Sequence, residues 1–433
     1  MRQAVIAGTL AQRLPFFYGW IILACVCCAA IARGGPAVAT LSIFVEPMTR
    51  EFGWTRTEMS GAVSLGGILA AVSSPMIGAF LDRLGARIIL CAAVLTTGAT
   101  IMALSQIHSL LAFYMLFCVA RLNFAGPFDL GIYGAVNSWF IARRAFAASI
   151  VAITQLGGLA VVPLVGHFVM AGQGWRAGWI AIGVLVLVVG FLPNWLLMVR
   201  RPEDLGLEPD GARRVPENSG GEAAGKKPPE PAFTRAQALR TRAFWMLSLF
   251  VLMAYPIQAG MSLHQAAHLI ERGLTPAAAV SSVALFSVAT AISALAFGNA
   301  GRWIGVRMAL ALSGVLLAVS ALVTAVVTTP AQGYLSAVLF GLGLGALQTV
   351  LPVAWADYFG RRNFGAIRGV ALTLQVTAQA SGPLLSGVLR DWTGDYVASL
   401  ICFAVLGVLA ALAALMIRAP RFDAGNSHAD GAT

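Results

Sequence analysis

Twelve apolar runs, each long enough to cross a lipid bilayer as a helix, constrain this chain more than any other feature of its sequence. A bilayer core takes about 20 apolar residues per helix, and only helices or closed barrels satisfy all their backbone polar groups there. Charged residues make up 11% of the 433 residues, whereas soluble domains carry about 25%. The sequence therefore predicts an all-α integral membrane protein with twelve transmembrane helices. They are expected at residues 18–44, 57–80, 87–105, 109–140, 145–170, 178–199, 243–263, 276–297, 306–328, 332–359, 364–389 and 396–417.

The two halves of the chain resemble each other in sequence. The turn GAFLDRLGAR at residues 78–87 joins two apolar runs, and it has a degenerate second copy, GNAGRWIGVR, at residues 298–307. The two glycines and the final arginine of the turn recur at a constant displacement, which indicates two parallel structural repeats. We therefore expect an N-terminal six-helix bundle over residues 1–200 and a pseudo-symmetric C-terminal six-helix bundle, with a short tail, over residues 242–433. The proline-rich segment 201–241 is expected to be a cytoplasmic linker between them.

Short motifs in the loops resemble those of a known family. The turn at residues 78–87 has the pattern G-x-x-x-D-R-x-G-x-R and resembles the loop between helices 2 and 3 of the major facilitator superfamily. Phe-Tyr-Gly-Trp at residues 17–20 and Arg-Pro-Glu-Asp-Leu-Gly-Leu at residues 201–207 are similar to bacterial members of its monocarboxylate and oxalate/formate branch. The resemblance covers essentially the whole chain. It implies the fold of that superfamily and a transporter that works by alternating access, not an enzyme.

The resemblance also implies a gating role for the turn, because in this superfamily the turn closes the cytoplasmic side when the carrier faces outward. Asp82 is expected near the N-terminus of the eleventh helix, around Asn363, where the helix dipole favours an anion. The second copy carries Arg302 in place of the acid, so only the first copy can make this contact. The gating residues implied here are Gly78, Asp82, Arg83, Gly85 and Arg87.

The distribution of basic residues predicts the orientation in the membrane. Of the 29 lysines and arginines, 22 fall on one side of the predicted topology, Arg368 among them, and 5 fall on the other. By the positive-inside rule, both termini lie in the cytoplasm. We expect a multi-pass protein of the inner (plasma) membrane. The net charge of +11 is spread over many loops, so it provides no concentrated basic face for a nucleic acid.

Arg33 and Arg121 are the two basic residues that this topology leaves inside helices. Each is expected roughly 17–18 Å from the outer end of its helix, and the family resemblance implies that both helices line a central cavity. Two cations at one depth repel each other unless an anion lies between them. Both are therefore candidate ligands of an anionic substrate. The alternative is a structural role, for example Arg33 binding carbonyls bared where the first helix opens at residues 34–36.

Asp129 is the acidic counterpart within the predicted helix 109–140, which is expected to bend at Gly126-Pro127. In a straight helix it lies about 12 Å along the axis from Arg121, too far for a direct ion pair unless the bend at Pro127 brings the two together. It is either a proton carrier or a structural acid bonded to a neighbouring helix. Uncharged side chains that could line the cavity, or hydrogen-bond between helices instead, are Tyr255, Gln258, Gln348, Gln375 and Gln379.

Some charges typical of the resembled branch are missing. Animal monocarboxylate transporters carry an Asp and an Arg in helix 8, and oxalate exchangers carry basic residues in helices 8 and 11. Here residues 276–297 hold no charge, and the eleventh helix has none between Arg368 and Arg390. We therefore expect the anion-holding charge in the N-terminal half. Lactate, pyruvate, formate and oxalate all stay in doubt as substrates.

The sequence contains no motif that indicates a cofactor. It has no catalytic triad, phosphate-binding loop or metal-ligand spacing, and its six cysteines all lie in apolar runs. We expect no cofactor, no metal and no obligate protein partner, the partners being the bilayer, a small anion and protons. His264 and His268, four residues apart, could bind a metal or a proton, but a wetted helix end is the simpler expectation.

The function expected from the sequence is secondary transport of a small organic anion, of the mono- or dicarboxylate class, by proton coupling or exchange. One alternative is a proton-driven exporter of apolar compounds, for which two buried arginines have no use. The other is a non-transporting membrane sensor on the same fold, which is expected to carry a large cytoplasmic domain that neither the linker nor the tail supplies.

Overall fold

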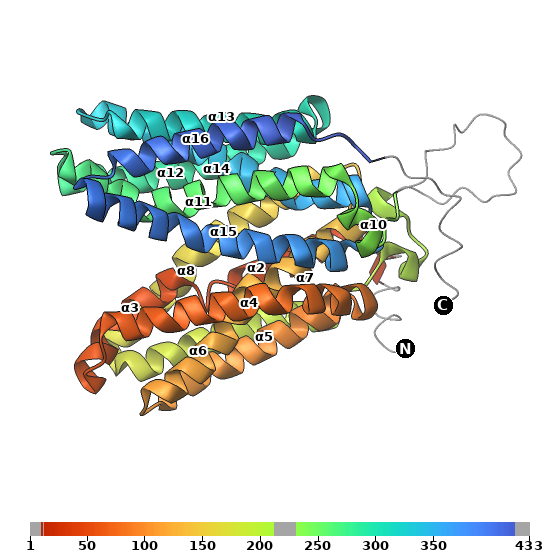
Figure 1. Cartoon of the computed structure of the whole chain (residues 1–433). Coiled ribbons are helices and arrows are strands. Elements are labelled where there is room, and N and C mark those ends of the chain that lie inside the picture. Colours follow the sequence, from red (N-terminus) through yellow and green to blue (C-terminus); the bar gives the residue numbers. More distant parts are fainter. Residues whose placement is uncertain (1–9, 12, 212–230, 421–433) are drawn as a thin grey trace, which may run out of the picture.

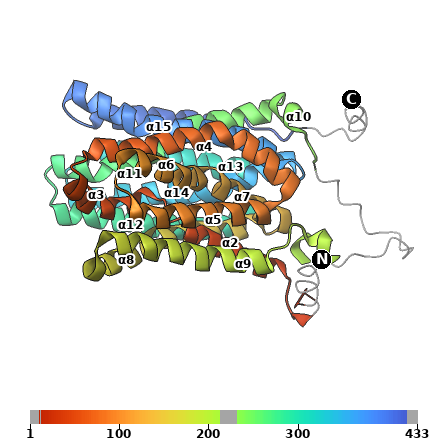
Figure 2. The same cartoon turned by 90° about the horizontal axis from the view of Figure 1, so that it is seen from below.

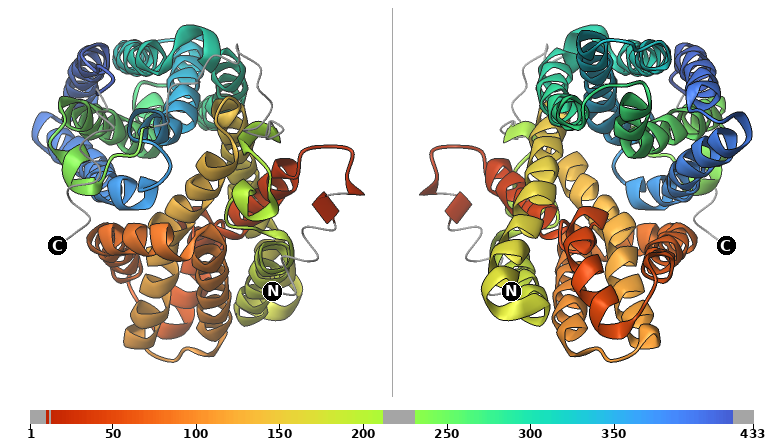
Figure 3. Two further views of the ribbon diagram at one scale, coloured as in Figure 1. Left: turned by 90° about the vertical axis from the view of Figure 1, so that its right-hand side faces the viewer. Right: turned by 90° about the vertical axis from the view of Figure 1, so that its left-hand side faces the viewer.

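The computed structural model describes residues 10, 11, 13–211 and 231–420. Within these ranges every element of regular secondary structure is a helix, and Figures 1 and 3 show the helices in two groups. The first group holds α2 (Gly19–Ala32), α3 (Val38–Phe52), α4 (Arg56–Leu84), α5 (Ala86–Ala103), α6 (Leu110–Ala125), α7 (Pro127–Trp139), α8 (Arg144–Leu185) and α9 (Leu192–Leu197). The second holds α11 (Arg242–Glu271), α12 (Pro276–Ile304), α13 (Val306–Ala325), α14 (Pro330–Phe359), α15 (Phe364–Thr393) and α16 (Val397–Leu415).

Nine of the described helices are long and apolar enough to cross a membrane. One of them, residues 144–197, turns back at Gly174, whose φ of 81° suits glycine, and so provides two legs. The α2–α3 pair and α15 supply two further legs of similar length. The described chain thus has the twelve predicted legs. All-helical multi-pass architecture is confirmed, with boundaries that differ by several residues.

Two predicted interruptions lie at the centre of the first group. The first interruption lies between Ala32 and Val38, where the first leg opens. The second lies at Gly126, directly before Pro127, and separates α6 from α7. A proline has no N–H to donate and disfavours a helical conformation in the residue before it. These breaks place polar backbone atoms at mid-membrane depth, where they must face protein or a cavity.

The expected wetted end around the two histidines is wrong. The helix that was expected to end at residue 263 continues to Glu271, and His268 is only 2% exposed. Its Nε2 lies 2.9 Å from the carbonyl oxygen of Thr324, and the ring of His264 stacks on Tyr396. The described residues contain no cluster of three metal-binding side chains. Helix packing accounts for both histidines.

Every hydrogen bond found between the two groups lies between the middle of the bundle and one end, within the described ranges. We call this the linker end, because the short helices Pro202–Leu205 and α10 (Arg235–Leu239) lie there (Figure 1). Helices α4 and α15 run side by side towards it (Figure 2). They approach so closely that a Cβ atom on Gly78 would collide with the carbonyl oxygen of Gly365.

A backbone carbonyl that lacks its helical hydrogen bond because of a proline strengthens this contact between the halves. Pro75 leaves the carbonyl oxygen of Ala71 without its helical donor, and the hydroxyl of Thr373 donates to that oxygen at 2.6 Å. Further along, Nη1 of Arg144 lies 2.9 Å from Oδ1 of Asp357. The structure is therefore closed at the linker end.

Candidate functional site

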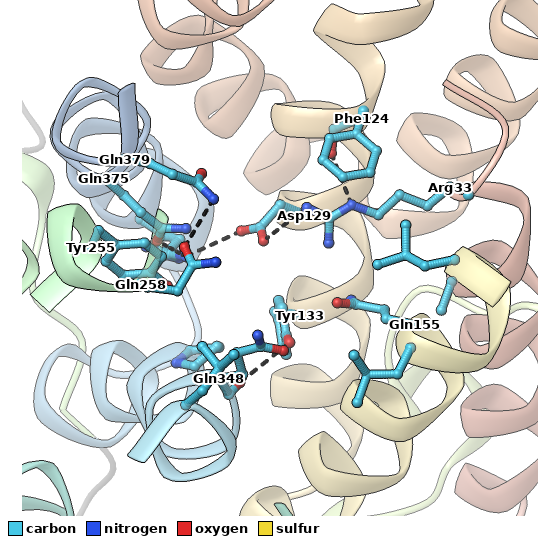
Figure 4. Close-up of a pocket in the computed structure, with 17 residues that line it drawn as sticks. Arg33, Phe124, Asp129, Tyr133, Gln155, Tyr255, Gln258, Gln348, Gln375 and Gln379 are labelled. Atoms are coloured by element: carbon cyan, nitrogen blue, oxygen red, sulfur yellow. Dashed lines mark hydrogen bonds and ion pairs between the residues drawn. The ribbon is translucent and has the colours of Figure 1, made fainter. Parts of the chain in front are cut away.

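A cavity of about 200 Å³ lies between the two groups of helices (Figure 4). Its walls come from both halves of the chain, with charged side chains from α7, from α15 and from the residue that follows α2. Among the candidates from the sequence, Arg33, Asp129, Tyr255, Gln258, Gln348, Gln375 and Gln379 line it, and so do Tyr133, Gln155 and Arg368. The cavity brings together side chains that are more than 300 residues apart in sequence.

Asp129 forms the centre of the charged wall (Figure 4). Its Oδ2 lies 3.2 Å from Nη2 of Arg368, and its Oδ1 lies 3.8 Å from Nη2 of Arg33. One carboxylate therefore lies between a guanidinium of the first half and a guanidinium of the second. The structural alternative for this acid, a bond to a neighbouring helix, is what the geometry displays. A role in proton transfer stays a prediction.

Arg368 is the charged residue that the sequence did not identify. Counting it as a cytoplasmic residue was wrong, because it is only 1% exposed and lines the cavity. Its Nη2 donates to Oε1 of Gln375 at 2.7 Å as well as to Asp129, while Nε and Nη1 find no acceptor within the described chain. The C-terminal half therefore also contributes a buried positive charge to the cavity, which was not expected from the sequence. The sequence does carry one indication that Arg368 faces the cavity: the cavity candidate Gln375 lies seven residues further along the same face of α15.

Arg33 follows the last residue of α2 and reaches the second interruption of the bundle. Its Nε donates to the carbonyl oxygen of Phe124 at 2.9 Å, and its guanidinium lies 4.5 Å from the centre of the Phe124 ring. The expected carbonyl contact thus exists, but on α6 and not at the opening of its own helix. Its side chain keeps 15% exposure and lines the cavity.

Arg121 contacts the same Phe124 ring as Arg33 but lies outside the cavity lining. Its guanidinium packs 4.3 Å from the centre of the same Phe124 ring, and its Cβ lies against Gly66 of α4. Nε and Nη1 of Arg121 are buried without an acceptor in the described part of the chain. A carboxylate held directly between Arg33 and Arg121 is therefore not what the structure provides. An aromatic ring contacts both cations instead, by an attraction of about 0.5–2 kcal/mol each.

The charges of the cavity lining favour an anion. With Asp129 ionised, the three charged lining side chains, Arg33, Asp129 and Arg368, sum to one positive charge, and Arg121 adds a second behind the Phe124 ring. An ionisable side chain at this depth costs several kcal/mol unless it is paired. A ligand carboxylate would complete the pairing of Arg368 and Arg33. A hydrophobic ligand would leave the excess charge uncompensated.

The predicted gating residues meet the second half at the linker end. Oδ1 and Oδ2 of Asp82 accept hydrogen bonds from the backbone N–H groups of Gly365 and Ala366, at 2.8 and 2.7 Å. Both N–H groups belong to the first turn of α15, whose helical partners are missing. Arg200 donates to the carbonyl oxygen of Asp82, and Arg87 donates to that of Trp195. The placement of Asp82 is as expected, while gating by this group of residues stays a prediction.

Asp82→Asn is expected to loosen the closed linker end. The amide keeps one acceptor but loses the charge at a helix N-terminus, which is worth about 0.3–1 kcal/mol, and one of two charge-assisted hydrogen bonds. We expect the population to shift towards the state open at this end, with slower net transport and largely unchanged binding. Labelling of a cysteine introduced at Ser138, which lies in this closed region, measures the shift. Unchanged labelling together with normal turnover would remove the gating role.

Comparisons with known proteins agree with this architecture. A family model described as Major Facilitator Superfamily matches residues 22–298. The chain is 26% identical to the membrane sensor protein UhpC of Salmonella typhimurium, over 84% of this chain and 83% of that protein. It is 25% identical to the hexuronate transporter of Bacillus subtilis (88% and 90% covered) and 25% identical to monocarboxylate transporter 11 of Mus musculus (89% and 84% covered).

The fold is also similar to solved structures. The proton:xylose symporter XylE superposes with a TM-score of 0.71 over 91% of this chain and 94% of that one, at 12% sequence identity. Identity this low supports the fold alone.

Proposed function

The chain belongs to the Major Facilitator Superfamily, and on that basis we propose that it moves a small organic anion across the membrane by alternating access. The observation that carries the proposal is the pair of guanidiniums, Arg33 and Arg368, on either side of Asp129 in the cavity between the halves. Because one arginine comes from each half, an anion bound between them contacts both halves at once. Such a ligand can stabilise the intermediate between the state that is closed at the linker end and the state that is closed at the opposite end.

Asp129 offers a route to coupling. While it is ionised it occupies the arginines, and when it is protonated it releases them to a substrate carboxylate. Proton uptake and anion binding then support each other, which is symport. If Asp129 stays ionised throughout, the cavity favours anion exchange. Two of the relatives carry names that denote carboxylates, hexuronate and monocarboxylate, in agreement with an anionic substrate.

Ligand-induced thermal stabilisation of the purified protein tests the anion site. Small carboxylates should raise the unfolding midpoint, whereas their uncharged amides should not, because only the carboxylates pair with the two arginines. Equal stabilisation by acids and amides would contradict an anion site.

We place the linker end in the cytoplasm, with both termini on that side. The excess of arginines there, such as Arg200, Arg201, Arg361 and Arg362 around the closed end, supports this orientation. Reporter tags at the C-terminus and at Ser219, which lies outside the described residues, should both be active only in the cytoplasm. Either tag reporting from the other side would reverse the topology.

A sensor without transport is the second candidate, favoured by the similarity to a protein named as a membrane sensor. Reconstituted vesicles distinguish the two, since a transporter moves labelled substrate across the bilayer and a sensor binds it without flux. Export of apolar compounds is the weaker alternative, because the lining carries uncompensated positive charge.

A further inference from the structure

We propose that the transported anion is a polyhydroxylated monocarboxylate, such as an aldonate or a uronate, and that the glutamines of the cavity select it by binding its hydroxyl groups. This inference rests on the proposed anion transport and adds the class of substrate. The observation behind it is the uncharged part of the lining, which the pairing of Arg33, Asp129 and Arg368 does not use.

The lining contains five glutamines and two tyrosines. The amides are partly occupied by each other and by the charged wall: Nε2 of Gln379 donates to Oε1 of Gln258 at 3.0 Å, and Gln375 accepts from Arg368. No partner within the described ranges is found for Nε2 of Gln155, and none of the hydrogen bonds found there involves the side-chain amide of Gln348. An amide has two N–H donors and a carbonyl with two lone pairs. Much of this capacity is therefore left for water or a ligand.

The arrangement around the cavity matches a molecule with one charged end and a polar chain. Figure 4 shows Gln258, Gln375 and Gln379 on the side of the cavity opposite Arg33, with Asp129 between. A carboxylate at Arg33 and Arg368 directs the remainder of its molecule towards these amides and Gln348. Arg33, Asp129 and Arg368 form one charged cluster and the other lining side chains are uncharged, so a ligand with a single carboxylate fits the cavity.

Size and desolvation support the same class. A cavity of about 200 Å³ is below the range of about 300–1,000 Å³ of drug-sized sites, and it suits a molecule the size of a six-carbon acid. An alkyl chain would displace water from the amides and offer no hydrogen bonds in return, whereas hydroxyl groups replace that water. Sites built to bind hydroxyl groups discriminate strongly against ligands that lack them.

Three ligands of equal chain length separate the contributions. Gluconate has the carboxylate and the hydroxyls, hexanoate has the carboxylate alone, and glucitol has the hydroxyls alone; glucuronate extends the test to a ring. We expect gluconate or glucuronate to bind the purified wild-type protein at least about 30-fold more tightly than hexanoate, and glucitol not to bind detectably.

The possible failures are distinguishable. Hexanoate binding as tightly as both sugar acids would overturn the selection by hydroxyl groups and leave anion transport standing. Glucitol binding as tightly as gluconate would overturn the anion site itself, and so would the absence of binding by all three acids.

Gln348→Leu tests the role of the amides directly, because this change disturbs no hydrogen bond found for the side chain. We expect gluconate affinity to fall at least about tenfold while hexanoate affinity stays the same or rises. Gln155→Leu gives a second test from the other half, and Gln106→Leu, at the exposed last residue of the short 3-10 helix Leu104–Gln106, is the matched control. An equal loss for both acids in the two cavity variants would indicate a structural role and overturn the proposal.

Discussion

Replacing Arg368 by alanine should abolish binding of the organic anion, with a loss of affinity of at least about 100-fold. Truncating one partner of a buried charge pair costs about 2–5 kcal/mol, and each factor of ten in affinity corresponds to about 1.4 kcal/mol. Arg368 is fully buried and has Nε and Nη1 without an acceptor in the described chain, so its remaining donors are available to a ligand. Ligand-induced stabilisation and equilibrium binding to the purified variant measure the loss.

Two further variants make the experiment specific. Arg368→Lys keeps the charge but loses the planar fork, so it should retain weak binding. Arg418→Ala removes an exposed arginine near the end of α16 and should bind as the wild type does. Alanine at residue 368 also leaves Asp129 with Arg33 alone, at 3.8 Å, so some loss of stability is expected. Wild-type affinity in a folded Arg368→Ala protein would place the anion site elsewhere.

Local sequence patterns predict some parts of this structure and not others. Hydropathy predicted the twelve legs, because a bilayer requires helices of a set length. The break at Gly126-Pro127 was also predictable, since proline acts on its own helix. These features depend on the residues immediately around them.

Arg368 was not predictable by the same reasoning. Counting charges by their distance from a helix end treats the first turn of α15 as a surface, yet that turn is covered by α4, where Gly78 meets Gly365 and Asp82 bonds the free N–H groups. Burial here comes from contact between helices almost 300 residues apart. The rotation of Arg121 about its helix was not predictable either, and this rotation decides that it faces Phe124 and not the cavity.

Asp129→Asn should uncouple transport from the proton gradient. Asparagine keeps the shape of the side chain but carries no charge, so it resembles the protonated acid at every pH. Uphill accumulation driven by protons should disappear, while exchange of substrate across the membrane continues, because Arg33 and Arg368 remain in place. Vesicles with and without a proton gradient, loaded or empty, separate the two activities. Asp391→Asn, an exposed acid on α15, is the matched control.

The same change has an opposite effect on binding, and this sign distinguishes a coupling residue from a structural one. In the wild type the carboxylate of Asp129 competes with the substrate for Arg33 and Arg368. Removing it should therefore tighten anion binding at neutral pH by about tenfold or more, the effect of removing about 1.4 kcal/mol of competition. The titratable and charged groups that line the cavity with this acid are the two arginines, Tyr133 of α7 and Tyr255 of α11. For a fully ionised ligand, binding to Asp129→Asn should thus depend less on pH than binding to the wild type, because the variant has no carboxylate to protonate at this position. Weaker binding in the variant, together with unchanged proton-driven accumulation, would assign Asp129 to holding the halves together and leave coupling to another group.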